Sequence, residues 1–381
     1  MNEIDDRCFS TICRGGGVQV AVNFINNILN SHFADELLIV VSPQVDKQIN
    51  SSLKNNVNYY VFDNARGFLK FWQGIQLSKL EKKFKPDLVF IVFGPSYWKP
   101  KAKSIQGFAI PHIVYPQISD LLYKDRPINK ILLNLLLKIK KNQILNNYEY
   151  MVVETETFKR LVTEKIGFDK NNIYVIENSF NKKFNKELIL SDNIKKSDFM
   201  NFFVPSSYYP HKNLEVLIDV AYILKNKYNI YLKFNFLIKS DSVEWSRFID
   251  IAKSKDVLSY LNTYGSVNND EMTRLYGEND FVILPTLAEV STAVYPESFI
   301  SKKLVFTSDL DFAKELCGDG AIYFDPLDSS DIALKIYQVI NDAELQNKII
   351  EYGSLQLSKK YISPEEKWEK QKKLINFVLS K

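Results

Sequence analysis

The chain has 381 residues, a formal net charge of +4 and 46% hydrophobic residues. This length suits two or three ordinary domains, and the apolar content supplies a core for each, which excludes a long disordered chain. No apolar run approaches the roughly 18 residues that a transmembrane helix needs, and we expect no signal peptide in the acidic start. Three cysteines without metal-ligand spacing favour a reducing cytoplasm.

The positive charge is concentrated in one part of the chain. Between Lys54 and Lys141 there are 16 lysines and arginines against five aspartates and glutamates, a local net charge of +11 that leaves −7 for the rest. Such an asymmetry predicts an anionic partner for one face of the protein.

The first half alternates predicted strands and helices. Helices fit 18–29 and 68–84, and apolar segments predict parallel strands at 37–41, 59–62, 87–93, 113–115 and 150–153. Three glycines, Gly15, Gly16 and Gly17, open the first helix. Because glycine lets a ligand approach the backbone, we favour a ligand-binding loop over a merely flexible turn.

His112 is one of three histidines and stands at the start of the strand predicted for 113–115. Two interpretations stay open at this point. The imidazole either lines a site and acts in catalysis, or packs at the base of the strand.

A basic, leucine-rich segment spans 125–141, with its leucines and isoleucines at helical spacing. It is either a core helix with a solvated lysine face or a helix that lies on an anionic membrane surface. The local positive charge favours the membrane surface.

The strand–helix order restarts near residue 180. The polar stretch 181–198 is the best linker candidate, so we predict two domains, 1–179 and 180–362. A final helix follows Ser363, with Pro364 in its first turn.

The second half holds the chemically informative residues. A strand ending near Val204 leads to Lys212 at the start of a helix, an arrangement that binds phosphate. The apolar strand 281–284 leads to a loop with Glu289 and a helix with Glu297. Ligands of open α/β sheets bind beyond the carboxyl ends of the strands, where these side chains are expected. The backbone N–H groups of Ser291, Thr292 and Ala293 are expected at the helix start, where an anion is favoured.

Together these segments resemble the donor half of GT-B glycosyltransferases, specifically the large retaining family four. The resemblance rests on Pro-His-Lys-Asn-Leu at 210–214, on Glu289 and Glu297 with seven residues between them, and on the stretch 307–326. It covers 200–350 strongly and the first half weakly. It implies an α/β fold of two Rossmann-like domains facing across a cleft, with the helix of 363–381 packing back on the first domain.

The resemblance also implies roles for these residues in binding a nucleotide sugar. Glu289 binds sugar hydroxyls and Glu297 the ribose, while Lys212, the glycine loop and the amides of 291–293 hold the diphosphate. Ser266 and Val267 contribute to the donor site, and His112 is a candidate near the reacting sugar. The chain departs from the family pattern in two places: Ser207 stands where relatives often carry an arginine, and the family's histidine position falls nearer Gln117.

The expected activity is a retaining hexosyl or deoxyhexosyl transfer in surface polysaccharide synthesis, such as O-antigen or capsule. The expected acceptor is a saccharide on undecaprenyl diphosphate, at the inner face of the cell membrane, where the protein would be cytoplasmic and peripheral. We expect no cofactor, no nucleic acid and no metal, because the Asp-Leu-Asp sequence at 309–311 is a weak match to a metal motif. The alternatives are a sugar-nucleotide epimerase on the same fold and a non-catalytic carbohydrate-binding subunit.

Overall fold

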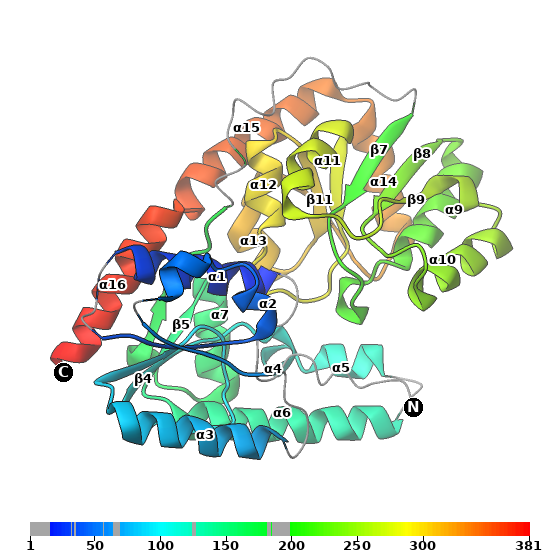
Figure 1. The fold of residues 1–381 in the computed structure, drawn as a ribbon. Helices are drawn as coiled ribbons and strands as arrows, with labels where there is room; N and C mark the ends of the chain where they lie inside the picture. Colours follow the sequence, from blue (N-terminus) through cyan, green and yellow to red (C-terminus); the bar gives the residue numbers. More distant parts are fainter. Residues whose placement is uncertain are drawn as a thin grey trace. The chain divides into compact units, whose positions relative to one another are not determined.

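The computed structural model describes residues 16–31, 33, 36–55, 57–63, 69–123, 127–180, 184 and 199–381. The chain forms two compact units, one of Met1–Glu177 with Pro364–Lys381 and one of Asn178–Ser363 (Figure 1). Apart from Phe184, the linker predicted at 181–198 lies outside the described residues.

The N-terminal unit is built on parallel strands. β1 (Leu38–Val41) pairs with β2 (Asn58–Val61), and a four-stranded sheet has the order β3-β4-β5-β6. These four strands are β3 (Leu88–Ile91), β4 (Lys103–Gly107), β5 (Tyr150–Val153) and β6 (Ile173–Val175). The helices are α1 (Gly16–Asn30), α2 (Pro43–Asp46), α3 (Leu69–Phe84), α4 (Pro111–Val114), α5 (Gln117–Leu122), α6 (Pro127–Asn147), α7 (Glu156–Leu161) and α16 (Pro364–Ser380).

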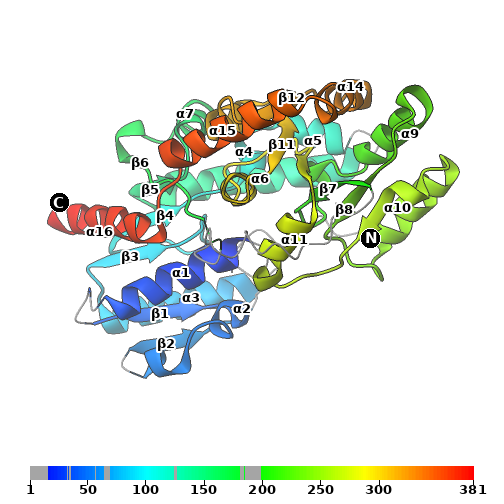
Figure 2. The same cartoon turned by 90° about the horizontal axis from the view of Figure 1, so that it is seen from above.

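Helix α16 completes the core of this unit from the far end of the sequence. It lies alongside α1 and β3 (Figure 2). Trp368 is buried and meets Phe24 and Phe33 edge-on, at ring-centroid distances of 5.8 Å each. Lys367 is also buried and pairs with Glu154 at 3.1 Å. Apolar burial and an ion pair therefore both fix this helix to the N-terminal unit.

Most predicted elements of the first half are confirmed, including the helices that became α1, α3 and α6. The strand predicted at 113–115 is wrong. Residues Pro111–Val114 form the short helix α4, whose first position suits a proline. The strand of this region is β4. Ser104 and Gln106 make its sequence read as polar, although both residues are buried.

The C-terminal unit is one six-stranded parallel sheet in the order β12-β11-β10-β7-β8-β9. From β7 the chain runs outward through β8 to β9, then returns beside β7 as β10 and continues to β12. The strands are β7 (Met200–Val204), β8 (Leu232–Phe236), β9 (Leu261–Thr263), β10 (Phe281–Leu284), β11 (Leu304–Ser308) and β12 (Ala321–Phe324). The helices are α9 (Val216–Tyr228), α10 (Val243–Ser254), α11 (Met272–Glu278), α12 (Val294–Ile300), α13 (Asp311–Cys317), α14 (Ser329–Ile340) and α15 (Ala343–Lys360).

This strand order reverses direction between β7 and β10. In open α/β sheets such a switch point opens a crevice at the carboxyl ends of the two strands, where ligands bind. The loops after β7 and β10 therefore border the crevice in which a ligand is expected to bind.

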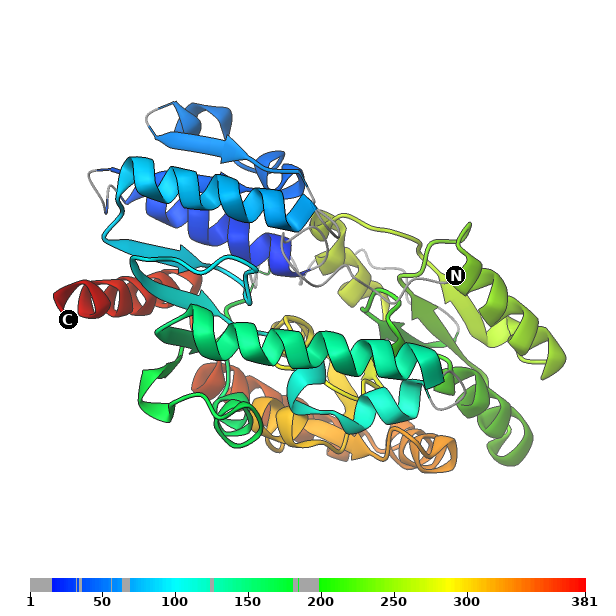
Figure 3. The same cartoon turned by 90° about the horizontal axis from the view of Figure 1, so that it is seen from below.

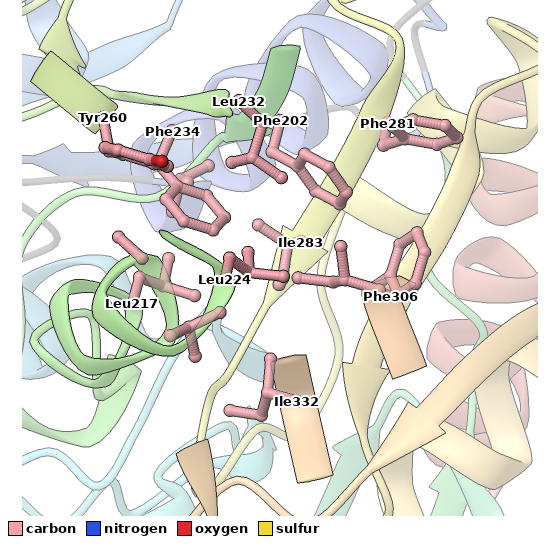
Figure 4. Packing of buried hydrophobic residues seen from close by; sticks show 14 of the residues in the cluster. Phe202, Leu217, Leu224, Leu232, Phe234, Tyr260, Phe281, Ile283, Phe306 and Ile332 are labelled. Atoms are coloured by element: carbon pink, nitrogen blue, oxygen red, sulfur yellow. The ribbon is translucent and has the colours of Figure 1, made fainter. Parts of the chain in front are cut away.

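A dense aromatic core holds these central strands in place. Figure 4 shows Phe202 of β7 among Phe234 of β8, Phe281 of β10 and Phe306 of β11. The ring centroid of Phe202 lies 4.9 to 5.6 Å from those of the other three. Because these interlocked rings leave the strands little freedom, the loops at their ends start from fixed positions.

Asparagine side chains, most of them buried, cross-link three strands of the same sheet. The Asn235 side-chain amide donates to Asn279 at 2.7 Å and to Asn201 at 3.2 Å, and its oxygen accepts from Asn262 at 2.8 Å. Asn235 is almost fully buried. Every member of the chain of bonds has a partner, so the network fixes the pairing of β7, β8 and β9 without an unpaired buried group.

Candidate functional site

Lys212 lies in the loop that follows β7. A single 3₁₀ turn, Pro210–Lys212, ends at Asn213, which adopts the left-handed conformation with φ 54°. The Asn213 side-chain amide donates to the Pro326 carbonyl oxygen at 2.7 Å, and Lys212 N–H donates to the Tyr209 carbonyl at 2.9 Å. Asparagine tolerates this backbone geometry better than most residues, so the turn that aims Lys212 has a local cause.

The loop after β10 is fastened to this turn. Leu287 N–H and the Thr286 hydroxyl both donate to the His211 carbonyl, at 2.8 and 3.3 Å. The Ser308 hydroxyl of β11 in turn donates to the Thr286 carbonyl at 2.7 Å. These bonds place the next part of the loop, with Glu289, beside Lys212.

Lys212 and Glu289 form an ion pair between Nζ and Oε1 at the switch point of the sheet. The two side chains are only 16% and 12% exposed. Burial lowers the pKa of Lys212 to about 8, because an ammonium group loses hydration there. A sheltered cation is costly to leave unpaired, so this lysine is prepared for an anionic ligand and is held by Glu289 without one.

The segment 291–293 lies between Glu289 and α12. The backbone N–H groups of Ser291, Thr292 and Ala293 donate no hydrogen bond to any described residue. The Ser291 hydroxyl is buried and also lacks a partner within the described chain, whereas the Thr292 hydroxyl accepts from Val294 N–H at 3.2 Å. Successive free N–H groups and an unpaired hydroxyl are suitable donors to a phosphate or sugar oxygen.

Glu297 lies in α12 and is only 9% exposed. Tyr276 donates its phenolic O–H to Glu297 Oε2 at 3.2 Å. Burial raises the pKa of Glu297 to about 8, and the tyrosine hydrogen bond offsets only part of that effect. Its carboxyl group contacts Tyr276, and the described contacts do not join it to Lys212 or Glu289.

Ser266 and Val267 follow β9 at the same carboxyl edge of the sheet. Gly265 has φ 75°, a backbone conformation that favours glycine, and its N–H donates to the Thr263 hydroxyl at 3.0 Å. Ser266 is exposed and Val267 half-buried. The loop therefore starts from a defined turn and presents these two residues beyond the strand.

The remaining candidates belong to the N-terminal unit. Gly16 begins α1 and Gly17 follows it, while Gly15 lies outside the described residues. His112 is half-buried in α4, where burial lowers its pKa and favours the neutral imidazole. Gln117 is exposed and begins α5.

Metal ligands do not gather in the part of the chain that the structure describes: no three His, Cys, Asp or Glu side chains there could hold an ion together. In the Asp-Leu-Asp sequence, Asp309 pairs with Lys314 at 2.5 Å, and the Asp311 carboxylate accepts from Phe312 N–H. None of the helices in the described ranges combines the length and apolar character that crossing a bilayer requires.

Several residues that shape the site were missed from the sequence. Thr286 and Ser308 fasten the Glu289 loop, and Asn213 sets the turn after Lys212. Asn213 could have been identified, because asparagine after a short polar stretch is typical of a left-handed turn. Thr286 and Ser308 act through contacts between separate strands, which no local pattern reveals.

Comparison with known proteins agrees with this architecture. Residues 185–356 match the family described as glycosyl transferases group 1. The O-antigen chain mannosyltransferase RfbU of Salmonella typhimurium is 25% identical over 234 residues, which are 61% of this chain and 62% of the relative. The alignment thus spans about three fifths of that relative's length.

Solved glycosyltransferase structures share the fold at low identity. A glycosyltransferase from Rickettsia africae has a TM-score of 0.68 and 16% identity, with 97% of each chain covered. Anabaena Alr3699/HepE, solved with UDP-glucose, has a TM-score of 0.70 and 12% identity, with 96% of this chain and 97% of that chain covered. Residues 185–356 are therefore similar to the glycosyl transferases group 1 family, and the two Rossmann-like units of the chain have the GT-B fold.

Proposed function

We propose that this protein transfers a hexose or deoxyhexose, with retention, from a nucleoside diphosphate sugar to a saccharide carried on undecaprenyl diphosphate. The setting is surface polysaccharide synthesis, O-antigen or capsule, at the cytoplasmic face of the membrane, where the protein is peripheral. The name of the Salmonella relative supports the O-antigen setting, and the UDP-glucose bound by the Anabaena protein supports the donor class.

The observation that carries this proposal is the sheltered ion pair of Lys212 and Glu289 at the switch point. A donor diphosphate attracts Lys212 away from Glu289, which frees the Glu289 carboxylate to accept from sugar hydroxyls. One binding event thus satisfies both charged groups with the two halves of one ligand. Glu297 then serves the ribose, and the free N–H groups of 291–293 serve the phosphate oxygens.

The reaction follows from these roles. The acceptor hydroxyl oxygen bonds to the anomeric carbon as the bond from that carbon to the phosphate oxygen breaks, on the same face of the sugar. The acceptor proton passes to the departing phosphate oxygen. Lys212 and the N–H groups of 291–293 stabilise the charge that develops on the diphosphate through preorganised dipoles and a fixed cation. The roles proposed for His112 and the glycines Gly15–Gly17 are to orient the reacting sugar and the diphosphate.

Fixed cations and amides can replace a metal in this scheme, so we propose that no metal is needed. Activity then survives a chelator such as EDTA. Complete loss that Mg²⁺ or Mn²⁺ restores would contradict this part of the proposal.

The test is release of nucleoside diphosphate from a panel of nucleotide sugars, beginning with those of mannose and glucose, with and without a lipid-linked saccharide. Transfer requires the acceptor. An epimerase would convert the donor without it, and a binding subunit would gain thermal stability from the donor and release nothing. In the matched variant Glu289→Gln, turnover falls by about a hundredfold or more while the fold persists, because the amide keeps the shape and loses the charge. Activity within about threefold of wild type removes Glu289 from the site.

A further inference from the structure

Helix α6 shows an apolar stripe on its outer face. Ile128, Ile131, Leu132, Leu135 and Ile139 follow helical spacing, and each is between 44% and 72% exposed. The stripe is about 16 Å long, at 1.5 Å per residue. Single exposed aliphatic side chains are ordinary, but five in one line form a patch of the kind that marks an interaction surface.

The opposite face of α6 already supplies the contacts that hold the helix to the unit. Leu133 and Ile144 are buried there. Lys140 is buried too, at 6% exposure. The apolar residues of the outer stripe are therefore not needed to hold α6 to the core of the unit.

The lysines of this helix are mostly engaged, which changes the expectation drawn from charge alone. Lys130 pairs with Asp120 at 3.0 Å, and Lys141 donates to the Lys165 carbonyl at 2.7 Å. Lys140 is buried. Lys138 is exposed, and the described contacts of this helix give it neither an ion pair nor a hydrogen bond. Contact through this helix thus depends chiefly on its aliphatic side chains.

Cationic side chains lie on another helix of the same unit. Lys79, Lys82 and Lys83 of α3 are exposed. Figures 1 and 3 show α3 and α6 along the same side of the N-terminal unit. An apolar stripe on the same side of the unit as a basic helix complements a surface whose interior is apolar and whose rim is anionic.

We propose that the outer face of α6 is the docking surface for an anionic lipid bilayer. The five aliphatic side chains enter the boundary between headgroups and acyl chains, while Lys138 and the lysines of α3 lie among the anionic headgroups. This inference rests on the proposed function, since a lipid-linked acceptor is presented at such a surface.

The test is flotation of the full-length protein with vesicles of phosphatidylglycerol and phosphatidylcholine, and with vesicles of phosphatidylcholine alone. Wild type floats with the anionic vesicles, and a substantial fraction stays bound at about 0.5 M salt, where charge attraction is screened. The variant Ile131→Gln, Leu135→Gln, Ile139→Gln loses at least tenfold in vesicle partitioning. The matched control, Val243→Gln, Leu334→Gln, Leu355→Gln, changes three exposed aliphatic residues of the C-terminal unit and binds as wild type does.

Three results overturn the proposal. One is flotation of the α6 variant equal to wild type, and another is absence of wild-type flotation. The third is a wild-type oligomer, seen by sedimentation velocity, that the α6 variant converts to a monomer, since the stripe would then belong to a second copy of the chain.

Failure here is distinguishable from failure of the proposed function. The α6 variant retains wild-type diphosphate release on a short soluble acceptor, because its substitutions leave Lys212 and Glu289 unchanged. Flotation without any donor turnover leaves the docking surface standing and overturns the glycosyltransferase. Donor turnover without flotation supports the glycosyltransferase and overturns the docking surface.

Discussion

Lys212 illustrates how one residue serves two partners. In the free protein it pairs with Glu289 under partial cover, and a bound diphosphate offers it two negative charges in the same place. Lys212→Ala removes this charge-assisted contact, so affinity for free nucleoside diphosphate falls by about 1.5–3 kcal/mol. Titration calorimetry measures the change.

The control for this variant is Lys314→Ala. Lys314 also pairs with a carboxylate, that of Asp309, but it is 60% exposed. Its removal leaves diphosphate affinity unchanged, because an exposed pair contributes little. Equal affinities for wild type and Lys212→Ala show that the lysine does not bind phosphate.

Glu297 makes stability depend on pH. Its ordinary pKa of 4.5 is raised to about 8 by burial, so the folded protein holds this proton more tightly than the unfolded chain does. The free energy of unfolding therefore falls as pH rises from about 4.5 to about 8, and the loss is complete above that window. Glu297→Gln keeps an acceptor for Tyr276 and has no proton to lose.

Thermal unfolding at pH values from 5.5 to 8.5 reveals the difference. The melting temperature of wild type decreases over this range relative to that of Glu297→Gln. Other titrating groups affect both proteins equally, so the difference between the two melting temperatures reports on Glu297. Parallel curves for the two proteins show that Glu297 is not ionising within a buried site.

At the scale of elements, apolar runs predicted the strands that are buried on both faces. The segment 281–284 became β10, and 304–307 falls within β11, because continuous aliphatic and aromatic residues leave few alternatives. β4 was missed because its sequence mixes Lys103, Ser104 and Gln106, whose burial depends on neighbours distant in the chain. The strand predicted nearby is the helix α4 instead.

The candidate site also has a part that the sequence predicts and a part that it does not. Lys212 and Glu289 could be identified because their residue types and spacing follow a family pattern. Their direct contact could not, because it depends on bonds from Thr286 and Leu287 to the His211 carbonyl. Those bonds join loops about 75 residues apart, and only the folded sheet brings them together.

The asparagine network gives an element-scale prediction. Asn235→Leu leaves the buried Asn201 and Asn279 each without one partner, whereas the exposed Asn262 can bond to water instead. Each loss at a buried amide costs about 1–3 kcal/mol, so the free energy of unfolding falls by about 2 kcal/mol or more. Urea unfolding measures it. The control Asn226→Leu, at an exposed asparagine of α9, changes the free energy of unfolding by less than about 1 kcal/mol. Similar losses for the two variants would show that the asparagine network does not stabilise the sheet.

At the scale of the whole molecule, α16 ties the N-terminal unit together from a distant part of the chain. Trp368→Ala opens a cavity between α16 and the rings of Phe24 and Phe33, at a cost of about 3–5 kcal/mol. Urea then unfolds the N-terminal unit first, and limited proteolysis leaves a protected fragment from within 178–363.

Phe377→Ala is the control for Trp368→Ala, because Phe377 lies on the same helix but is 40% exposed. It costs less and leaves unfolding close to wild type. If Trp368→Ala destabilises both units to the same extent, the two cores are not separate.

The divided N-terminal unit has a consequence for biosynthesis. A ribosome makes residues up to Glu177 first, yet the helix that finishes their core is translated only after Ser363. The middle unit, Asn178–Ser363, is continuous and can close its sheet while translation proceeds. The part of the protein made first is thus the part completed last, and its nascent apolar surface must stay covered until α16 emerges.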